Sequence, residues 1–208
     1  MSAARTEILR RIEAAVSRSA PVEIPRAYRG PSGAERGSVA VLDLMQDRLV
    51  DYKAVVHRVE LRDVPAVIAA ALMDAGIQRA VVPDGFPSDW LPSGPAWIGD
   101  EPPLTAAELD ELDGVLTTCR IAVAETGTIV LDGAPGQGRR AVSLVPDYHL
   151  VVVRAEQVVG SVPDAVAELE PTNPTTWISG PSATSDIELQ RVEGVHGPRN
   201  LVVLLVTA

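Results

Sequence analysis

Side chains that could do chemistry concentrate in two stretches of this sequence, of which the longer is 175–198. An apolar, β-branched run at 175–178 predicts a buried strand, and Ser185 with Glu188 fits a capping box that predicts a short helix over 186–191. Helix N-termini present unpaired N–H groups and partial positive charge, so the loops around this helix suit an anionic group. A purely structural strand–turn–helix connection is the alternative. The residues expected to hold the anion are Ser179, Gly180, Pro181, Ser182, Ser185, Asp186, Gly194 and Gly197.

His196 lies in the glycine loop that ends this stretch, next to Gly197 and Pro198. An imidazole that is neutral near pH 7 can donate a hydrogen bond or act as acid or base. His196 is therefore a candidate catalytic residue. The alternative is that it ties its own loop to a backbone carbonyl, and both interpretations stay open.

The second stretch is IAVAETGTIVL, residues 121–131, in which two apolar runs flank a short polar segment. Glu125 would stand at the end of a strand as a nucleophile or base, and Gly127 would let the backbone approach a ligand. A plain strand turn is the competing interpretation. Thr126, Gly127 and Thr128 are the binding residues expected beside Glu125.

The two stretches are expected to share one crevice, because each follows an apolar strand and each breaks with glycine. Loops after neighbouring strands of a parallel sheet lie on the same edge, outside the carboxyl ends of the strands. The hydroxyl and N–H groups of 179–185 would hold an anion there, with Glu125 and His196 beside it.

Three further residues carry polar chemistry but have simpler explanations. Arg139 and Arg140 follow a glycine–proline loop and could bind a carboxylate through two parallel hydrogen bonds. Paired arginines in such a loop are more often solvated. His149 begins a predicted strand and is interpreted as structural.

Metal and cofactor chemistry is not expected in this chain. Cys119 is the single cysteine, and one thiol cannot hold an iron–sulfur cluster or a structural zinc ion. The three histidines are far apart in sequence. The phosphate-binding and dinucleotide-binding glycine motifs are also missing.

The length, and the lack of a signal peptide or membrane-spanning run, predict a single globular chain of the cytoplasm. The net charge is −10, which argues against nucleic acid or an anionic membrane as the main partner. No apolar run reaches the length of a membrane span, and the N-terminus lacks the apolar core of a signal peptide. Aromatic residues are only 3% of the chain, so the core must consist of aliphatic side chains.

Helical and strand patterns alternate along the chain, which predicts an α/β fold with a mainly parallel sheet flanked by helices. Residues 1–37 are expected to form an arm, a helix followed by a proline- and glycine-rich linker, and 38–208 a single domain. The pattern of 114–120 fits helix and strand equally. The expected helices are 6–17, 39–49, 64–75, 105–112 and 163–169, and the expected strands are 54–59, 79–83, 141–145, 149–153 and 201–206.

Four phrases occur together in this order: AETGTIVL (124–131), GRRAVSLVPDYHLVVV (138–153), ISGPSATSDIE (178–188) and GVHGP (194–198). In this combination the sequence resembles the lactate utilization protein C family, whose members are also called LUD-domain proteins. The resemblance is strong over about 115–206 and loose elsewhere. It implies a fold similar to the ribose-5-phosphate isomerase and CoA-transferase group.

The resemblance also implies a role in oxidising L-lactate to pyruvate beside two partner proteins that carry the iron–sulfur clusters. The chain would then be a non-redox component that binds an anionic small molecule or docks on these partners. A second hypothesis is an acyl- or CoA-transferase-like or sugar-phosphate-type enzyme, because Glu125 lies in a Glu-x-Gly setting similar to the nucleophile motif of CoA transferases. A third is a scaffold whose loops only form an interface.

Overall fold

The computed structural model describes residues 3–17, 23–181, 183–184, 192–193 and 197–207. Its largest element is a six-stranded sheet in the order β1-β12-β7-β4-β2-β3, and every neighbouring pair is parallel. The predicted α/β class with a mainly parallel sheet is confirmed. The strands are β1 Val55–Glu60, β2 Arg79–Val81, β3 Ala96–Ile98, β4 Gly114–Thr118, β7 Tyr148–Arg154 and β12 Asn200–Thr207.

A second sheet has four strands in the order β8-β5-β6-β9. The chain enters it directly from the carboxyl ends of β4 and β7, so this sheet continues two strands of the first. β5 and β6 form an antiparallel hairpin, and β9 runs antiparallel to β6 on its other side. The strands are β5 Ile121–Val123, β6 Thr128–Leu131, β8 Val158–Val159 and β9 Thr176–Ile178.

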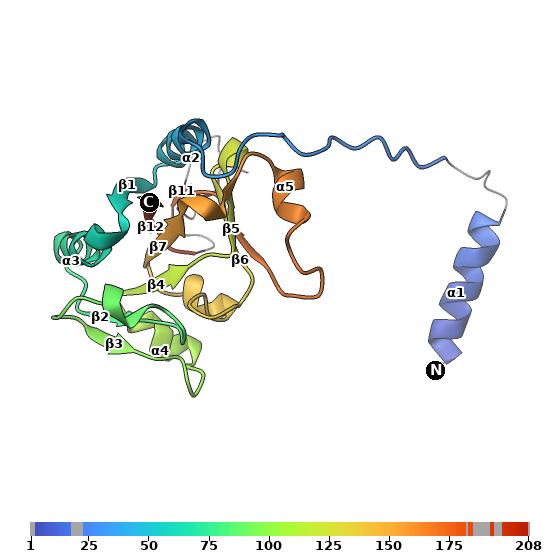
Figure 1. Cartoon of the computed structure of the whole chain (residues 1–208). Helices are drawn as coiled ribbons and strands as arrows, with labels where there is room; N and C mark the ends of the chain where they lie inside the picture. Colours follow the sequence, from blue (N-terminus) through green and yellow to red (C-terminus); the bar gives the residue numbers. More distant parts are fainter. Residues whose placement is uncertain (1–2, 18–22, 182, 185–191, 194–196, 208) are drawn as a thin grey trace.

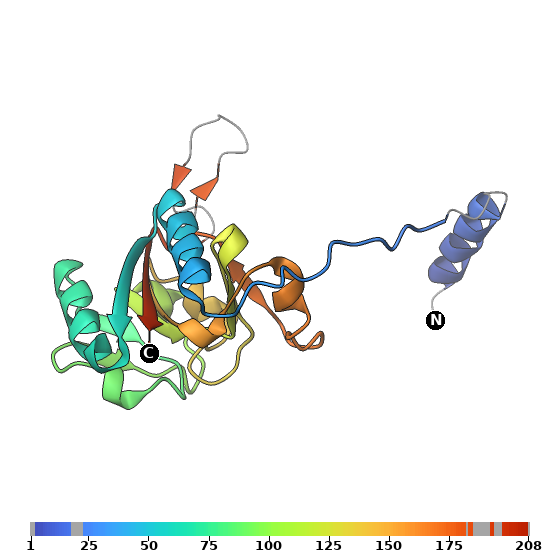
Figure 2. The ribbon, with the colours of Figure 1, turned by 45° about the horizontal axis from the view of Figure 1, so that its top comes forward.

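A short antiparallel pair, β10 Ala183–Thr184 with β11 Val192–Glu193, follows β9. Figure 2 shows this hairpin projecting from the domain beyond the helix that precedes β1. The predicted helix 186–191 lies outside the described residues.

Helices cover both faces of the main sheet (Figure 1). α2 Val39–Asp51 and the four-stranded sheet lie on one face, where they enclose an aliphatic core with the inward residues of β7 and β12. α3 Val64–Asp74 covers the other face. α4 Ala106–Asp110 and α5 Val162–Val166 are short, and each begins with a capping box. None of the described helices is long and apolar enough to cross a membrane.

The N-terminal arm begins with α1 Ala3–Val16, which buries none of its residues and stands away from the rest of the chain in Figure 1. The last part of the arm, residues 32–37, lies against the four-stranded sheet and α5. Asp164 at the start of α5 accepts hydrogen bonds from the Ser32 N–H (3.2 Å) and hydroxyl (2.8 Å), and the Gly37 N–H donates to the Val158 carbonyl (3.0 Å). The domain boundary at residue 37 stays a prediction.

The structure corrects three local predictions. Residues 141–145 are not a strand but the 3₁₀ turn η4 Arg140–Ser143 and the bend that follows it, because the backbone turns back here toward β7. The strand predicted at 175–178 exists as β9 but is not buried, since it lies at the edge of its sheet and Trp177 is 42% exposed. The segment 114–120, ambiguous in sequence, contributes the buried strand β4.

Candidate functional site

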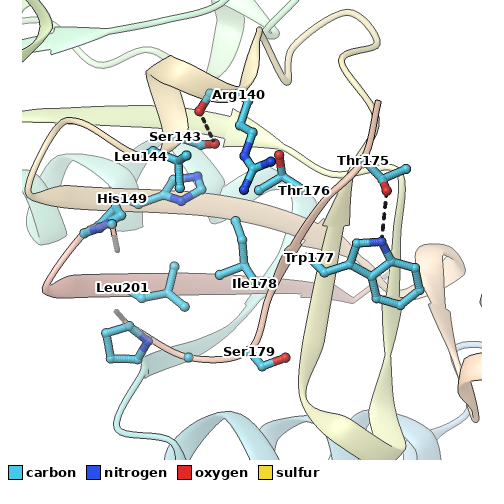
Figure 3. Close-up of a pocket in the computed structure, with 14 residues that line it drawn as sticks. Arg140, Ser143, Leu144, His149, Thr175, Thr176, Trp177, Ile178, Ser179 and Leu201 are labelled. Atoms are coloured by element: carbon cyan, nitrogen blue, oxygen red, sulfur yellow. Dashed lines mark hydrogen bonds between the residues drawn. The ribbon is translucent and has the colours of Figure 1, made fainter. Parts of the chain in front are cut away.

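A cavity of about 480 Å³ opens between the main sheet and β9 (Figure 3). Its floor is formed by His149 and Leu201, which stand at the amino ends of β7 and β12. The 3₁₀ turn η4 contributes Arg140 and Ser143 on one side. The cavity therefore lies at the opposite edge of the parallel sheet from the carboxyl-end crevice that the strand pattern predicts.

The walls of the cavity combine polar and apolar side chains. Leu144, Ile178 and Leu201 contribute aliphatic side chains from three elements that are far apart in sequence. Ile178 reaches the cavity because side chains alternate along β9, so that it faces the main sheet while Trp177 points to the outer side.

Arg140 supplies the positive charge of the site. Its side chain is exposed and extends into the cavity beside Thr176 (Figure 3). No carboxylate of the described residues lies within ion-pairing distance of Arg140, whereas the adjacent Arg139 is paired with Asp100 at 2.6 Å. A guanidinium without an internal partner at a cavity can bind a carboxylate or another planar anion through two hydrogen bonds.

His149 lies beneath Arg140 at the floor of the cavity and is 1% exposed. Its Nε2 atom is 2.8 Å from the Thr117 hydroxyl, which holds the ring in place. Burial disfavours the charged form and lowers the pKa of His149 to about 4. The imidazole is therefore neutral at physiological pH, and it offers a hydrogen-bonding group without adding charge to the site.

The two stretches that carried the sequence prediction meet beside the cavity. The hydroxyls of Thr128 and Ser179 are 2.7 Å apart, and Thr126 is 2.7 Å from Thr128 in turn. They meet because β6 and β9 are antiparallel neighbours, with Ile129 opposite Ile178. Of these three hydroxyl residues only Ser179 lines the cavity, together with Gly180, Pro181 and Gly197 from the predicted set.

Glu125 lies at the tip of the β5–β6 hairpin, in the 3₁₀ turn η3 Ala124–Thr126, and does not line the cavity. Its carboxylate forms an ion pair with Arg29 of the N-terminal arm. The hydrogen bond from Arg29 lowers the pKa of Glu125, which opposes a role as a base near neutral pH. The Glu125 backbone N–H donates to the Gly160 carbonyl (3.1 Å), so the tip is held against the loop before α5.

Gly127 and Gly180 both permit close backbone packing against the end of α2. Gly127 has a φ of 58°, and a Cβ there would stand 2.8 Å from the Arg48 Cβ atom. Gly180 has a φ of 82°, and a Cβ there would stand 2.6 Å from the Tyr52 Cβ atom. The positive φ values and the tight contacts explain glycine at both positions. They also attach the hairpin tip and the loop after β9 to one helix.

Several predicted site residues lie outside the described residues, and the joint site of Glu125 with His196 therefore stays a prediction. These residues are Ser182, Ser185, Asp186, Gly194 and His196.

A second cavity of about 630 Å³ lies at the carboxyl ends of β2 and β3 and is lined by the glycine–proline loop 133–138. Arg139 is the one arginine among the described residues that line this cavity, and its side chain already forms an ion pair. Arg139 donates two hydrogen bonds to Asp100, at 2.6 and 2.9 Å, and also binds the Leu104 carbonyl. Asp84, Glu101 and Asp132 add further carboxylates to the lining. This cavity is therefore a poorer host for an anion than the one at Arg140.

Sequence reasoning missed Ser143 and understated Arg140 and His149 as residues of this cavity. The sequence indicates Arg140 as a possible carboxylate binder, but it does not show that Arg139 pairs with Asp100 whereas Arg140 has no carboxylate partner among the described residues. The position of His149 at the start of a strand does not by itself predict that it lines a cavity. That depends on which strand lies beside β7. The phrase 138–153, which contains all three residues, was the available signal.

Comparison with known proteins gives close matches. Residues 103–206, half of the chain, match the LUD domain family. A protein of Deinococcus radiodurans named lactate utilization protein C is 47% identical over 207 residues, which cover 98% of this chain and 95% of that protein. The protein of the same name from Shouchella clausii is 31% identical over 122 residues, 55% of this chain and 53% of that protein. This second match thus spans about half of each protein.

A solved structure is similar as well. The crystal structure of a DUF162 family protein from Deinococcus radiodurans superposes with a TM-score of 0.69 at 42% sequence identity. The match covers 80% of this chain and 96% of that one. The two proteins are therefore similar in sequence as well as in fold.

Proposed function

The chain belongs to the LUD domain family, and from this premise we propose that it is a non-redox component of a system that oxidises L-lactate to pyruvate. The names of its relatives, lactate utilization protein C, support a role in lactate utilization. Within that system the chain binds an anionic small molecule in the cavity at Arg140 and works in the cytoplasm beside partner proteins that carry iron–sulfur clusters.

The observation that carries the anion site is the Arg140 guanidinium, which extends into the cavity without a carboxylate partner among the described residues. A charged group in a partly apolar cavity is stabilised by an opposite charge, and a bidentate carboxylate supplies both charge and geometry. The Ser179 and Thr176 hydroxyls and the neutral His149 imidazole surround the same space and can add hydrogen bonds.

The cysteine content supports placing the redox centres in partner proteins. Cys119 is the only cysteine of the chain, and it is buried in the aliphatic core that α2 and the two sheets share. Burial raises its pKa, so the thiolate that metal ligation and redox exchange require is disfavoured. Iron–sulfur clusters are commonly held by four thiolates.

The test uses a bacterium that carries this gene and grows on L-lactate as sole carbon source. A deletion strain should fail to grow on L-lactate, and the wild-type gene should restore growth. Arg140→Gln should not restore it, because glutamine has no charge to bind the anion. Arg62→Gln is the matched control, since Arg62 is an exposed arginine that pairs with Glu60 far along the sequence from the cavity residues. Normal growth of the deletion strain, or full rescue by Arg140→Gln, contradicts the proposal.

Acyl or CoA transfer through Glu125 stays a prediction. The geometry offers no observation in its favour, because the carboxylate lies outside the cavity and pairs with Arg29. Incubation with acyl-CoA donors and acids, followed by a search for a covalent adduct on Glu125, tests it directly.

A further inference from the structure

The size of the cavity at Arg140 sets the first condition on its ligand. Its volume of about 480 Å³ has room for about 16 water molecules, at the ~30 Å³ that each occupies in the liquid. Lactate has three carbon and three oxygen atoms and would displace only a small part of this water. Sites that bind small molecules bury most of the surface of their ligand, so this cavity fits a larger one.

The charge of the lining sets the second condition. Arg140 is the only charged side chain among the described residues that line the cavity. His149 is buried beneath it and is held by Thr117. One positive group matches one carboxylate, and a second carboxylate in the same space would lose its hydration without a partner.

The apolar side chains of the walls set the third condition. Leu144 at the end of η4, Ile178 of β9 and Leu201 of β12 face the cavity (Figure 3). Pro181 and Pro198 add apolar surface to its lining. Aliphatic surface of this kind gains stability only when an apolar group covers it. A ligand that fills the cavity therefore has to bring hydrocarbon as well as charge.

From these three conditions we infer that the cavity binds a monocarboxylate whose apolar chain is longer than the methyl group of lactate. The carboxylate lies on Arg140, and the chain covers Leu144, Ile178 and Leu201. The inference rests on the proposed function in one respect, namely that the cavity binds an anion. It goes further by excluding lactate itself as the best ligand of this chain.

Isothermal titration calorimetry on the full-length protein tests the inference with the straight-chain series propanoate, butanoate and hexanoate, and with L-lactate. A buried methylene contributes about 0.8 kcal/mol, so each added methylene should tighten binding about fourfold. Hexanoate should therefore bind about 60-fold more tightly than propanoate. L-Lactate should bind no more tightly than propanoate.

Matched ligands and variants separate the contributions of charge and chain. Hexan-1-ol has the same chain without the charge and should bind far more weakly than hexanoate. Hexanedioate has a second carboxylate and should also bind more weakly. Arg140→Gln should weaken every carboxylate, whereas Arg62→Gln should change none. Leu144→Ala should weaken hexanoate binding more than propanoate binding, and so reduce the gain from propanoate to hexanoate.

The outcomes distinguish this inference from the proposed function. The inference is overturned if propanoate and hexanoate bind with equal affinity, or if L-lactate or hexanedioate binds more tightly than hexanoate. It is also overturned if no member of the series binds. If growth on L-lactate still depends on Arg140 in such a case, the proposed function stands without the inference. If hexanoate binds as expected but the deletion strain grows normally on L-lactate, the inference stands and the proposed function fails.

Discussion

Protonation of His149 should destabilise the folded chain as the pH falls below neutral. The ring is 1% exposed, and its pKa is lowered from the ordinary value of 6.5 to about 4 by burial. Between these two values the unfolded chain binds a proton at His149 and the folded chain does not. Stability is therefore complete above pH 6.5 and decreases as the pH falls toward 4.

The magnitude follows from the two pKa values. A shift of one unit corresponds to about 1.4 kcal/mol, so the full effect, reached below pH 4, is about 3 kcal/mol. Between pH 7.5 and 5 the free energy of unfolding should fall by about 2 kcal/mol through His149 alone. The carboxylates with lowered pKa values, Asp147 and Asp164 among them, act mainly at lower pH, since their stabilising effect is lost only as the pH falls through 3.8 and below.

Urea denaturation at pH 7.5 and pH 5 measures this effect in the wild type and in His149→Gln. Glutamine can still bond to Thr117 but does not titrate, so the variant should lose about 2 kcal/mol less than the wild type over this range. His57→Gln is the matched control, because His57 is exposed on β1. If the wild type and His149→Gln change equally with pH, His149 does not remain neutral in the fold and the reasoning is wrong.

The remaining predictions concern the loops that surround the site. Gly180→Ala should destabilise the fold by about 2 kcal/mol or more in thermal or urea unfolding, because φ is 82° and the new Cβ meets α2. Gly76 has a similar φ of 69° but open space around it, so Gly76→Ala should cost only about 1 kcal/mol of folding stability. If the two variants lose the same stability, the close approach of Gly180 to Tyr52 is not the cause of the loss. Asp164→Ala should increase proteolytic cleavage within 23–37, because the Asp164 carboxylate binds Ser32 of the arm. Asp110→Ala, on exposed α4, is the control and should leave cleavage unchanged. Unchanged cleavage in Asp164→Ala would show that other contacts hold the arm. Thr105→Ala should lower the folding stability by about 1 kcal/mol, because it removes the capping box of α4. Thr105→Ser keeps the hydroxyl and should retain most of that stability. A serine variant as unstable as the alanine variant would contradict the capping explanation.

The sequence determined the type of most elements, because apolar spacing reports local geometry and burial. The run 201–206 is apolar on every side, and it became β12, an interior strand of the parallel sheet that is covered on both faces. The spacing of apolar residues over 39–49 likewise became the buried face of α2. Residues 141–145 were misread because a short apolar run does not distinguish a strand from a buried turn.

The sequence also determined that the stretches at 125–127 and 179–181 are loops at the ends of strands. Only the tertiary structure decided what these loops face. The β5–β6 hairpin turns back along the main sheet, so its tip packs on α2 and the cavity opens at the amino ends of β7 and β12.

The physical reason is that spacing along the chain specifies neighbours within a strand or helix, whereas sheet order specifies which distant ends meet. The hydroxyls of Thr128 and Ser179, 51 residues apart, touch only because β6 and β9 pair. The neutral state of His149 depends in the same way on the elements that bury it, and only the tertiary structure places Asp100 against Arg139 while leaving Arg140 without a carboxylate partner among the described residues. None of these contacts is encoded by the residue types next to them in the sequence.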